Sequence, residues 1–219
     1  MWCVPKLDDE YIERMEHLLD LYALPYNAKE PVVCIDEKSK QLLHNVRSPL
    51  PMTEHTARRI DYEYRRNGTR NIFCAVEPKG GRRRIAVTKR RTKQDFATFV
   101  CDLVETDHAG ASKIHIVCDN LNTHFPPSFY ETFGKEEADR ILSRIEFHYT
   151  PKHASWLDMA EIELSILSRT AIKGRVPTAE ELAARCTRFQ DTRNNRRAVI
   201  NWKFTKDDAR RALKYEVEN

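Results

Sequence analysis

Two apolar runs, each followed at once by an aspartate, constrain the fold of this chain more than any other feature. Residues 32–35 lead into Asp36, and residues 114–118, apolar apart from His115, lead into Asp119. A short and nearly continuous apolar run is typical of a central strand that is buried on both faces of a sheet. The sequence therefore predicts two buried strands, each with a carboxylate at its end.

A third acidic residue, Glu161, lies in a segment with helical spacing that begins at Ser155. Carboxylates from two strand ends and one helix can converge on a single point. Such a group repels itself unless divalent cations neutralise it, and hard oxygen ligands favour Mg²⁺ or Mn²⁺ over zinc. We therefore interpret Asp36, Asp119 and Glu161 as a candidate metal-binding site.

Each of these carboxylates also has a plainer interpretation. Asp36 by itself is compatible with a surface turn, and Glu161 with an exposed helix position. Glu163 competes with Glu161 as the functional residue, although it points about 200° away at 3.6 residues per turn. Asp158 shares a face with Glu161, because residues three apart are neighbours on a helix. The spacing alone leaves Glu161 and Glu163 as alternatives.

The periodicity of apolar residues, together with the positions of Gly and Pro, predicts an alternation of strands and helices. Strands are predicted at residues 31–36, 71–76, 84–88, 113–118 and 145–149, with 41–46 extending or pairing with the first. Helices are predicted at residues 7–22, 92–107, 126–142, 155–173, 179–193 and 206–217. The second and third strands form a hairpin across residues 78–81, and residues 47–68 form a loop.

This order of elements indicates an α/β fold in which a mixed five-stranded sheet is flanked by helices, as in a ribonuclease H-like domain. In such a domain the first strand lies beside the strand that follows the first helix, so we expect Asp36 and Asp119 to be neighbours. We divide the chain into an N-terminal helical arm or linker (1–29), a ribonuclease H-like domain (30–175) and C-terminal helices (176–219).

The net charge of +4 is small, so it permits a polyanionic partner without requiring one. The basic residues are nevertheless clustered, in stretches that cover residues 58–70, 82–93 and 193–197. A solvated surface explains any single cluster as well, but three clusters around a carboxylate site favour a phosphate backbone as partner. Our candidates for DNA contact in these stretches are Arg82, Arg83, Arg84, Arg90 and Arg91.

The six cysteines include no Cys-x-x-Cys pair, and four of them lie inside apolar runs. They are typical of small buried side chains in a reducing compartment rather than of a zinc site or a disulfide framework. The sequence shows neither a signal peptide nor an apolar run long enough to span a bilayer. We therefore expect a cytoplasmic protein without a membrane partner.

Three short motifs carry a resemblance to a known family. They are Ile35-Asp36-Glu37-Lys38, then Asp119-Asn120 with His124, and the block of residues 149–161 that ends in Glu161. Over about residues 30–175 the chain resembles the catalytic domain of DDE transposases of the mariner superfamily, in the bacterial insertion-sequence branch. Asp158 is a departure, because the family usually has asparagine at this position.

The resemblance implies two Mg²⁺ or Mn²⁺ ions held by Asp36, Asp119 and Glu161, which would be the catalytic residues of a ribonuclease H-like DDE catalytic domain. It also implies cleavage at transposon ends and strand transfer into target DNA by direct transesterification. Two ions about 4 Å apart can activate the attacking oxygen and stabilise the leaving oxygen. Asp158 would add a negative charge near these ions.

The same resemblance implies a bacterial, nucleoid-associated protein, and we expect a homodimer on DNA because two transposon ends must be brought together. Full-length relatives carry N-terminal helix-turn-helix modules that recognise the ends, whereas this sequence begins with a short arm. We expect either a separately encoded helix-turn-helix half or a truncated element.

Four histidine and lysine positions have weaker interpretations. Lys152 and His153 precede the catalytic helix and are candidates for DNA contact. His124 is a further candidate, but it could equally orient a carboxylate or hold the start of a helix. His115 lies inside a strand and is typical of a core histidine with its hydrogen bonds satisfied.

Two other functions are compatible with the sequence. A ribonuclease H-like nuclease that cuts without strand transfer would use the same carboxylates. A truncated, non-catalytic remnant would bind DNA or a partner through the basic clusters and helices alone. Product assays distinguish the first from a transposase, and the absence of any metal-dependent product would indicate the second.

Overall fold

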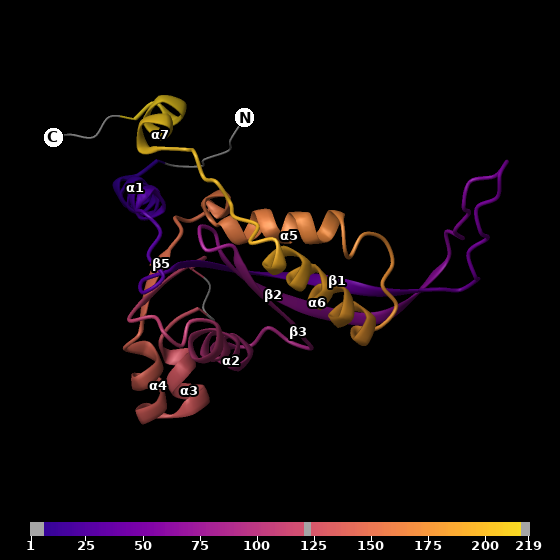
Figure 1. Ribbon diagram of the computed structural model, residues 1–219, viewed down its shortest axis with the longest axis horizontal. Helices are drawn as coiled ribbons and strands as arrows, with labels where there is room; N and C mark the ends of the chain where they lie inside the picture. The colour runs from indigo at the N-terminus through magenta and orange to yellow at the C-terminus, as the bar shows by residue number, and fades with distance from the viewer. Residues whose placement is uncertain (1–6, 121–123, 216–219) are drawn as a thin grey trace.

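A computed structural model describes residues 7–120 and 124–215 and has a mixed α/β architecture (Figure 1). Five strands form one sheet in the order β3-β2-β1-β4-β5. Their bounds are β1 Val32–Asn45, β2 Tyr64–Glu77, β3 Arg82–Thr88, β4 Ile114–Cys118 and β5 Ile145–Tyr149. β2 is antiparallel to both β1 and β3, whereas β4 is parallel to both β1 and β5. The predicted fold class is therefore confirmed.

Helices cover both faces of the sheet. Their bounds are α1 Asp9–Ala23, α2 Lys93–Asp102, α3 Pro127–Phe133, α4 Lys135–Leu142, α5 Met159–Arg169, α6 Ala179–Asn195 and α7 Lys206–Leu213. α2, α3 and α4 lie on one side of the sheet, and α1, α5, α6 and α7 lie on the other (Figure 1). Within the described residues, no helix is long and apolar enough to cross a membrane.

The alternation of side chains along β1 divides the core between these two layers. Val33 and Ile35 are buried against α2 and α3, whereas Cys34 belongs to the cluster on the opposite face, together with Val117 of β4. Residues two apart on a strand share a face. Asp36 therefore lies on the same face as Cys34, which is the face covered by α1 and α5.

The segment predicted as an N-terminal arm is α1, and it is packed onto the sheet. Met15 and Leu18 have no exposed surface and share a hydrophobic cluster with Cys34 and Val117. Asp8 caps the helix by accepting a hydrogen bond from the backbone N–H of Tyr11. α1 is thus part of the helical layer that covers the face of the sheet on which Asp36 lies.

The loop predicted at residues 47–68 is shorter than expected, because β1 and β2 continue as a two-stranded ribbon. β1 runs without a break to Asn45, and β2 begins at Tyr64, which pairs with Asn45. The register shifts between Gln41 and Leu43. Residues 64–69 are exposed, so backbone pairing rather than burial forms this part of β2, and a hydrophobic pattern does not reveal it.

Three predicted helices are interrupted. The first, 92–107, ends in a π-helical turn, Leu103–Asp107, and the second, 126–142, breaks at Gly134, whose φ of 78° suits glycine. The third, 155–173, begins with a separate 3₁₀ turn, Ser155–Leu157, before α5 starts. Asp158, rather than Ser155, caps α5 by accepting a hydrogen bond from Ala160 N–H at 2.8 Å.

A buried ion cluster joins α5, β3 and α6. Glu163 and Arg83 have fully buried side chains, and Arg83 Nε lies 3.0 Å from Glu163 Oε1. Arg193 of α6 donates from Nε to Oε1 at 2.8 Å and from a terminal guanidinium nitrogen to Oε2 at 3.0 Å. Glu163 is therefore a structural residue here, and the burial of Arg83 contradicts its predicted contact with DNA.

We expect Glu163→Gln to destabilise the fold strongly, because it leaves the buried Arg83 without its counter-charge. Removing one partner of a buried pair lowers the free energy of unfolding by about 3–5 kcal/mol. Urea denaturation measures this loss. The matched control is Glu161→Gln on the same helix, which is exposed and should change the free energy by less than about 1 kcal/mol in EDTA. Equal stability of the two variants would contradict the role of the ion cluster.

Candidate functional site

Asp36 and Asp119 lie on neighbouring strands at the same level of the sheet. β1 pairs in parallel with β4 so that Cys34 is opposite Val117, and each aspartate lies two residues further along. Neighbouring strands are about 4.8 Å apart, and residues two apart share a face. The two aspartates are therefore side by side, as the strand order predicts. Asp36 lies inside the long strand β1, however, rather than at its end.

Glu161 lies in the first turn of α5, directly above this part of the sheet. Leu164 and Leu167 of the same helix belong to one buried hydrophobic cluster with Leu42 of β1, and this cluster holds the helix on the sheet. The segment that leads into α5 is fixed at the other end, because Thr150 N–H donates to the carbonyl oxygen of Cys118. α5 thus carries Glu161 toward the end of β4.

The three carboxylates influence one another electrostatically. Burial raises the pKa of Asp36 from 3.8 to about 7, and the charges of Glu161, Glu37 and Asp119 add to the rise. A hydrogen bond of 2.7 Å from the backbone N–H of Glu37 partly opposes it. The charges of Glu161 and Asp119 are therefore near enough to disfavour ionisation of Asp36.

Asp158 adds a fourth acidic group to the same region. Its side chain is buried, and burial, followed by the charge of Asp36, raises its pKa well above the usual range. The charges of Asp119 and Glu161 act in the same direction. A protonated Asp158 resembles the asparagine found in the family motif, because both present a carbonyl oxygen to Ala160 N–H.

The donor set suits hard divalent cations. Asp36, Asp119 and Glu161 offer carboxylate oxygens, the ligands that Mg²⁺ and Mn²⁺ prefer, and the charges of Glu161 and Asp119 add to the rise in the pKa of Asp36 that burial causes. The ligand atoms of these three carboxylates are not all within 4.8 Å of one another, whereas those of His115, Glu146 and His148 are. Two ions about 4 Å apart share their ligands over a wider span, so the geometry is compatible with a two-metal site.

His124 is buried between two carboxylates. Its Nε2 lies 2.7 Å from Glu37 Oε1, and its Nδ1 lies 2.7 Å from Asp119 Oδ1. Its ring packs on Phe96 with a centroid distance of 4.4 Å. Burial alone would lower the pKa of His124, but hydrogen bonds to Asp119, Cys118 and Glu37 outweigh it and raise the pKa far above its usual value.

One ring nitrogen of His124 thus contacts Glu37 and the other contacts Asp119, so the ring can orient Asp119. This burial disfavours the predicted DNA contact and favours the alternative, orientation of a carboxylate. The contact of Glu37 with His124 is one that sequence reasoning overlooked. The adjacent Asp36-Glu37 pair could have indicated this contact. Adjacent strand residues point to opposite faces of a sheet, so Asp36 faces α5 while Glu37 faces α2.

The remaining predicted DNA contacts fall into two groups. Lys152, His153, Arg90 and Arg91 are exposed. Lys152 and His153 line a shallow depression together with Asn120, next to the N-terminal end of α1. The arginines at the start of β3 are already engaged within the fold. Arg83 is buried in the ion cluster, Arg84 pairs with Asp107, and Arg82 donates to the Asp107 carbonyl oxygen.

Comparison with known proteins identifies relatives of this arrangement. A family model described as DDE superfamily endonuclease matches residues 31–183. No curated protein matches the sequence. Among solved structures, the Mos1 mariner paired end complex with Mn is 13% identical, with a TM-score of 0.55 over 90% of this chain and 60% of that chain. The catalytic domain of Mos1 mariner transposase is 10% identical, with a TM-score of 0.54 over 85% of this chain and 83% of that chain.

At this level of identity the structural likeness establishes the fold, which is the ribonuclease H-like fold of the Mos1 catalytic domain. The chain spans about 60% of the length of the Mos1 transposase chain in the paired end complex. The family match covers the sheet, the three candidate carboxylates and most of the helices that position them. On this evidence the chain belongs to the DDE superfamily of endonucleases.

Proposed function

We propose that this chain is the catalytic domain of a transposase that cuts transposon ends and joins them to target DNA. The observation that carries the proposal is the electrostatic coupling of Asp36 with Asp119 and Glu161, within a family of DDE endonucleases. Solved relatives include a Mos1 paired end complex and a Mos1 strand transfer complex, which supports DNA ends as the substrate.

Asp36, Asp119 and Glu161 would hold two Mg²⁺ or Mn²⁺ ions, and Mos1 complexes with Mn and with Mg support this choice. Bound ions of this kind stabilise both the attacking and the leaving oxygen of a phosphodiester. Bound cations would favour the ionised form of Asp36, whose pKa is about 7 in the metal-free protein.

The surrounding residues prepare this set of ligands. The His124 ring lies 2.7 Å from one carboxylate oxygen of Asp119 and would help to orient this side chain. The buried Asp158 fixes the start of α5, and with it the position of Glu161. The buried ion cluster around Glu163 holds the far side of α5 against β3 and α6. No nucleophilic side chain is needed, so strand joining proceeds by direct transesterification.

The exposed basic residues supply a surface for the phosphate backbone. Lys152 and His153 lie in the loop before α5, and Arg90 and Arg91 precede α2. Exposed arginines at 58, 59, 65 and 66 extend the basic surface along the β1–β2 ribbon. Contacts of this kind position DNA without reading its sequence.

The context that we propose is a bacterial insertion sequence, with a cytoplasmic, nucleoid-associated protein. The partner that we propose for recognition of the transposon ends is a separately encoded helix-turn-helix half. Pairing of two transposon ends requires two catalytic domains, so the active species is a homodimer on DNA.

We expect Asp36→Asn to stabilise the metal-free protein at alkaline pH. The pKa of Asp36 is about 7 when folded and 3.8 normally, so ionisation destabilises the fold as pH rises through this window. In EDTA at pH 8, the variant should exceed the wild type by on the order of 1–3 kcal/mol, after discounting for partial exposure. The difference should vanish near pH 4.

Thermal unfolding at several pH values measures this effect, with the exposed Asp139→Asn as control. Mg²⁺ should raise the melting temperature of the wild type more than that of Asp36→Asn. An Asp36→Asn protein that is less stable than the wild type at pH 8 in EDTA would contradict the electrostatic account of the site.

We expect Asp36→Asn, Asp119→Asn and Glu161→Gln each to reduce Mn²⁺-dependent cleavage of labelled terminal-repeat DNA by at least about 100-fold. Loss of a residue that only supports a metal ligand costs about 10–100-fold, and loss of a ligand itself should cost at least as much. The exposed Asp191→Asn is the control and should retain activity. Joined products indicate a transposase, and cleavage alone indicates a nuclease. DNA binding without any product indicates a non-catalytic binder, and an active Asp119→Asn protein would refute the assignment.

We also expect two copies of the chain on paired transposon ends. Light scattering of the protein with end DNA should give the mass of a dimer bound to two duplexes. The chain without DNA provides the reference mass. A single protomer on paired ends would refute the proposed assembly.

A further inference from the structure

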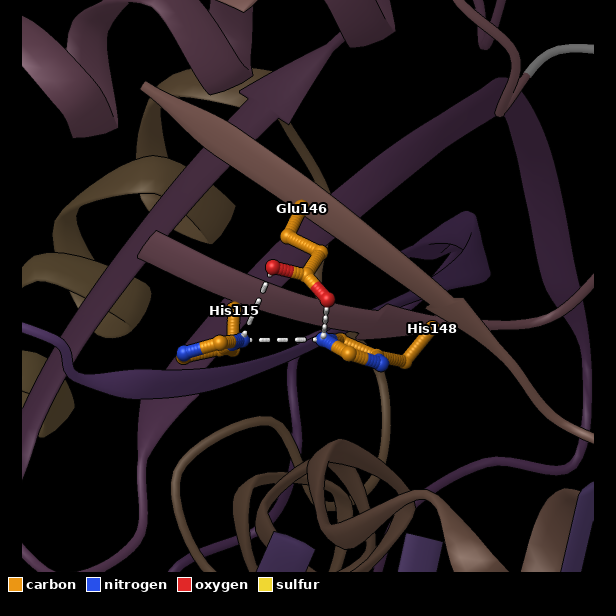
Figure 2. Close-up of side chains that lie close together, drawn as sticks. All are labelled: His115, Glu146 and His148. Carbon is orange, nitrogen blue, oxygen red and sulfur yellow. Dashed lines mark hydrogen bonds and ion pairs between the residues drawn. The ribbon is translucent and has the colours of Figure 1, made fainter. Parts of the chain in front are cut away.

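A second cluster of metal-ligating side chains lies on the sheet, away from the carboxylate site. His115 of β4 and Glu146 and His148 of β5 point toward one another (Figure 2). Among the described residues this is the group of three whose ligand atoms all lie within 4.8 Å of one another. His115 precedes Asp119 by four residues, which corresponds to about 13 Å along a strand. The cluster is therefore a site of its own.

The strand register explains why these side chains meet. His115 is directly opposite Glu146 in the parallel β4–β5 ladder, and His148 is opposite Val117. Residues two apart share a face, so all three side chains emerge on the side of the sheet that α1 covers. Two neighbouring strands thus present two imidazoles and one carboxylate at adjacent positions.

The separations suit a small tetrahedral cation. His115 Nδ1 lies 3.0 Å from His148 Nε2, and each of these atoms lies 3.9 Å from an oxygen of Glu146. Zinc bonds of about 2.0–2.2 Å require ligand atoms roughly 3.3–3.6 Å apart. Shifts of about 0.5 Å or less would therefore complete three corners of a tetrahedron. The fourth corner is accessible, because the Glu146 side chain is 46% exposed.

His17 of α1 completes the arrangement from outside. Its Nε2 lies 2.8 Å from His148 Nδ1, and the two rings stack with centroids 5.0 Å apart. A hydrogen bond to one ring nitrogen fixes the tautomer and aims the other nitrogen at the metal, as is usual for metal-binding histidines. The side chain of His148 is almost completely buried, so its orientation is well fixed.

One neighbouring cation competes for the carboxylate. Lys113 Nζ lies 3.4 Å from Glu146 Oε2. Both partners of this pair are about half exposed, and exposed pairs of this kind contribute little to stability. A divalent ion with two imidazole ligands can therefore displace or share this contact.

We propose that His115, Glu146 and His148 bind one zinc ion, with His17 as the residue that positions His148. Two imidazoles and one carboxylate favour Zn²⁺ over the hard Mg²⁺ ion, so the site differs in chemistry from the carboxylate site. Bound zinc links β4 to β5 and, through His17, fastens α1 to the sheet. This link does not depend on the proposed transposase activity.

Equilibrium dialysis of the full chain against ZnCl₂ in excess MgCl₂ tests the site. We expect one zinc ion per chain in the wild type and also in the Asp36→Asn/Asp119→Asn double variant. His115→Gln and Glu146→Gln should weaken zinc binding by at least 100-fold, and His17→Gln by about 10–100-fold. His44→Gln, at an exposed position on β1, is the matched control and should bind zinc normally.

A second measurement follows the link to α1. Zinc should slow hydrogen exchange of the α1 amides in the wild type, and the effect should be smaller in His17→Gln. The variants replace His115 and Glu146, which are partly exposed, because replacing the buried His148 could disturb the fold. Circular dichroism checks that both variants fold. Loss of zinc binding in the Asp36→Asn/Asp119→Asn protein, or normal binding in both His115→Gln and Glu146→Gln, would overturn the proposal.

Discussion

The parallel pairing of β1 with β4 is the contact on which the rest of the structure depends. Only three residue pairs form this ladder, from Val32 opposite His115 to Cys34 opposite Val117. It sets Asp36 level with Asp119, and it joins the antiparallel half of the sheet to the parallel half. Because a shift of one residue would turn a strand's side chains to the opposite face, this short ladder decides which residues meet the helices.

Two groups of acidic side chains lie on the face of the sheet that carries Asp36, and they differ in whether cations neutralise them. Around Asp36 the acidic groups outnumber nearby cations, and burial raises the pKa values of Asp36 and Asp158. Two residues beyond Glu161 on α5, Glu163 is held by two arginines. One helix therefore carries a neutralised carboxylate that stabilises the fold and an uncompensated one that is available for a cation. The charge of Glu161 also adds to the rise in the pKa of Asp36 that burial causes.

Much of the fold could be predicted from the sequence, because the strong signals are local. The apolar runs at 32–35 and 114–118, the turn at 78–81 and the weak point at Gly134 all have local causes, and the structure has the elements that they indicate. The β1–β2 ribbon escaped prediction because backbone pairing, not burial, forms it. The burial of Arg83 was not predicted either, because an arginine-rich stretch gives no sign of a buried partner 80 residues away.

The candidate site was predictable to the same degree. The sequence indicates Asp36, Asp119 and Glu161, but the contact of His124 with Glu37 depends on how α2 and β1 pack together. The ribbon adds a mechanical consequence. From Asp36 to Asn45, β1 is paired with β2 over a length of about 30 Å, at 3.3 Å per residue. The register shift between Gln41 and Leu43 interrupts the regular pairing between Asp36 and the ribbon tip, and irregularities of this kind bend a strand locally and increase its twist.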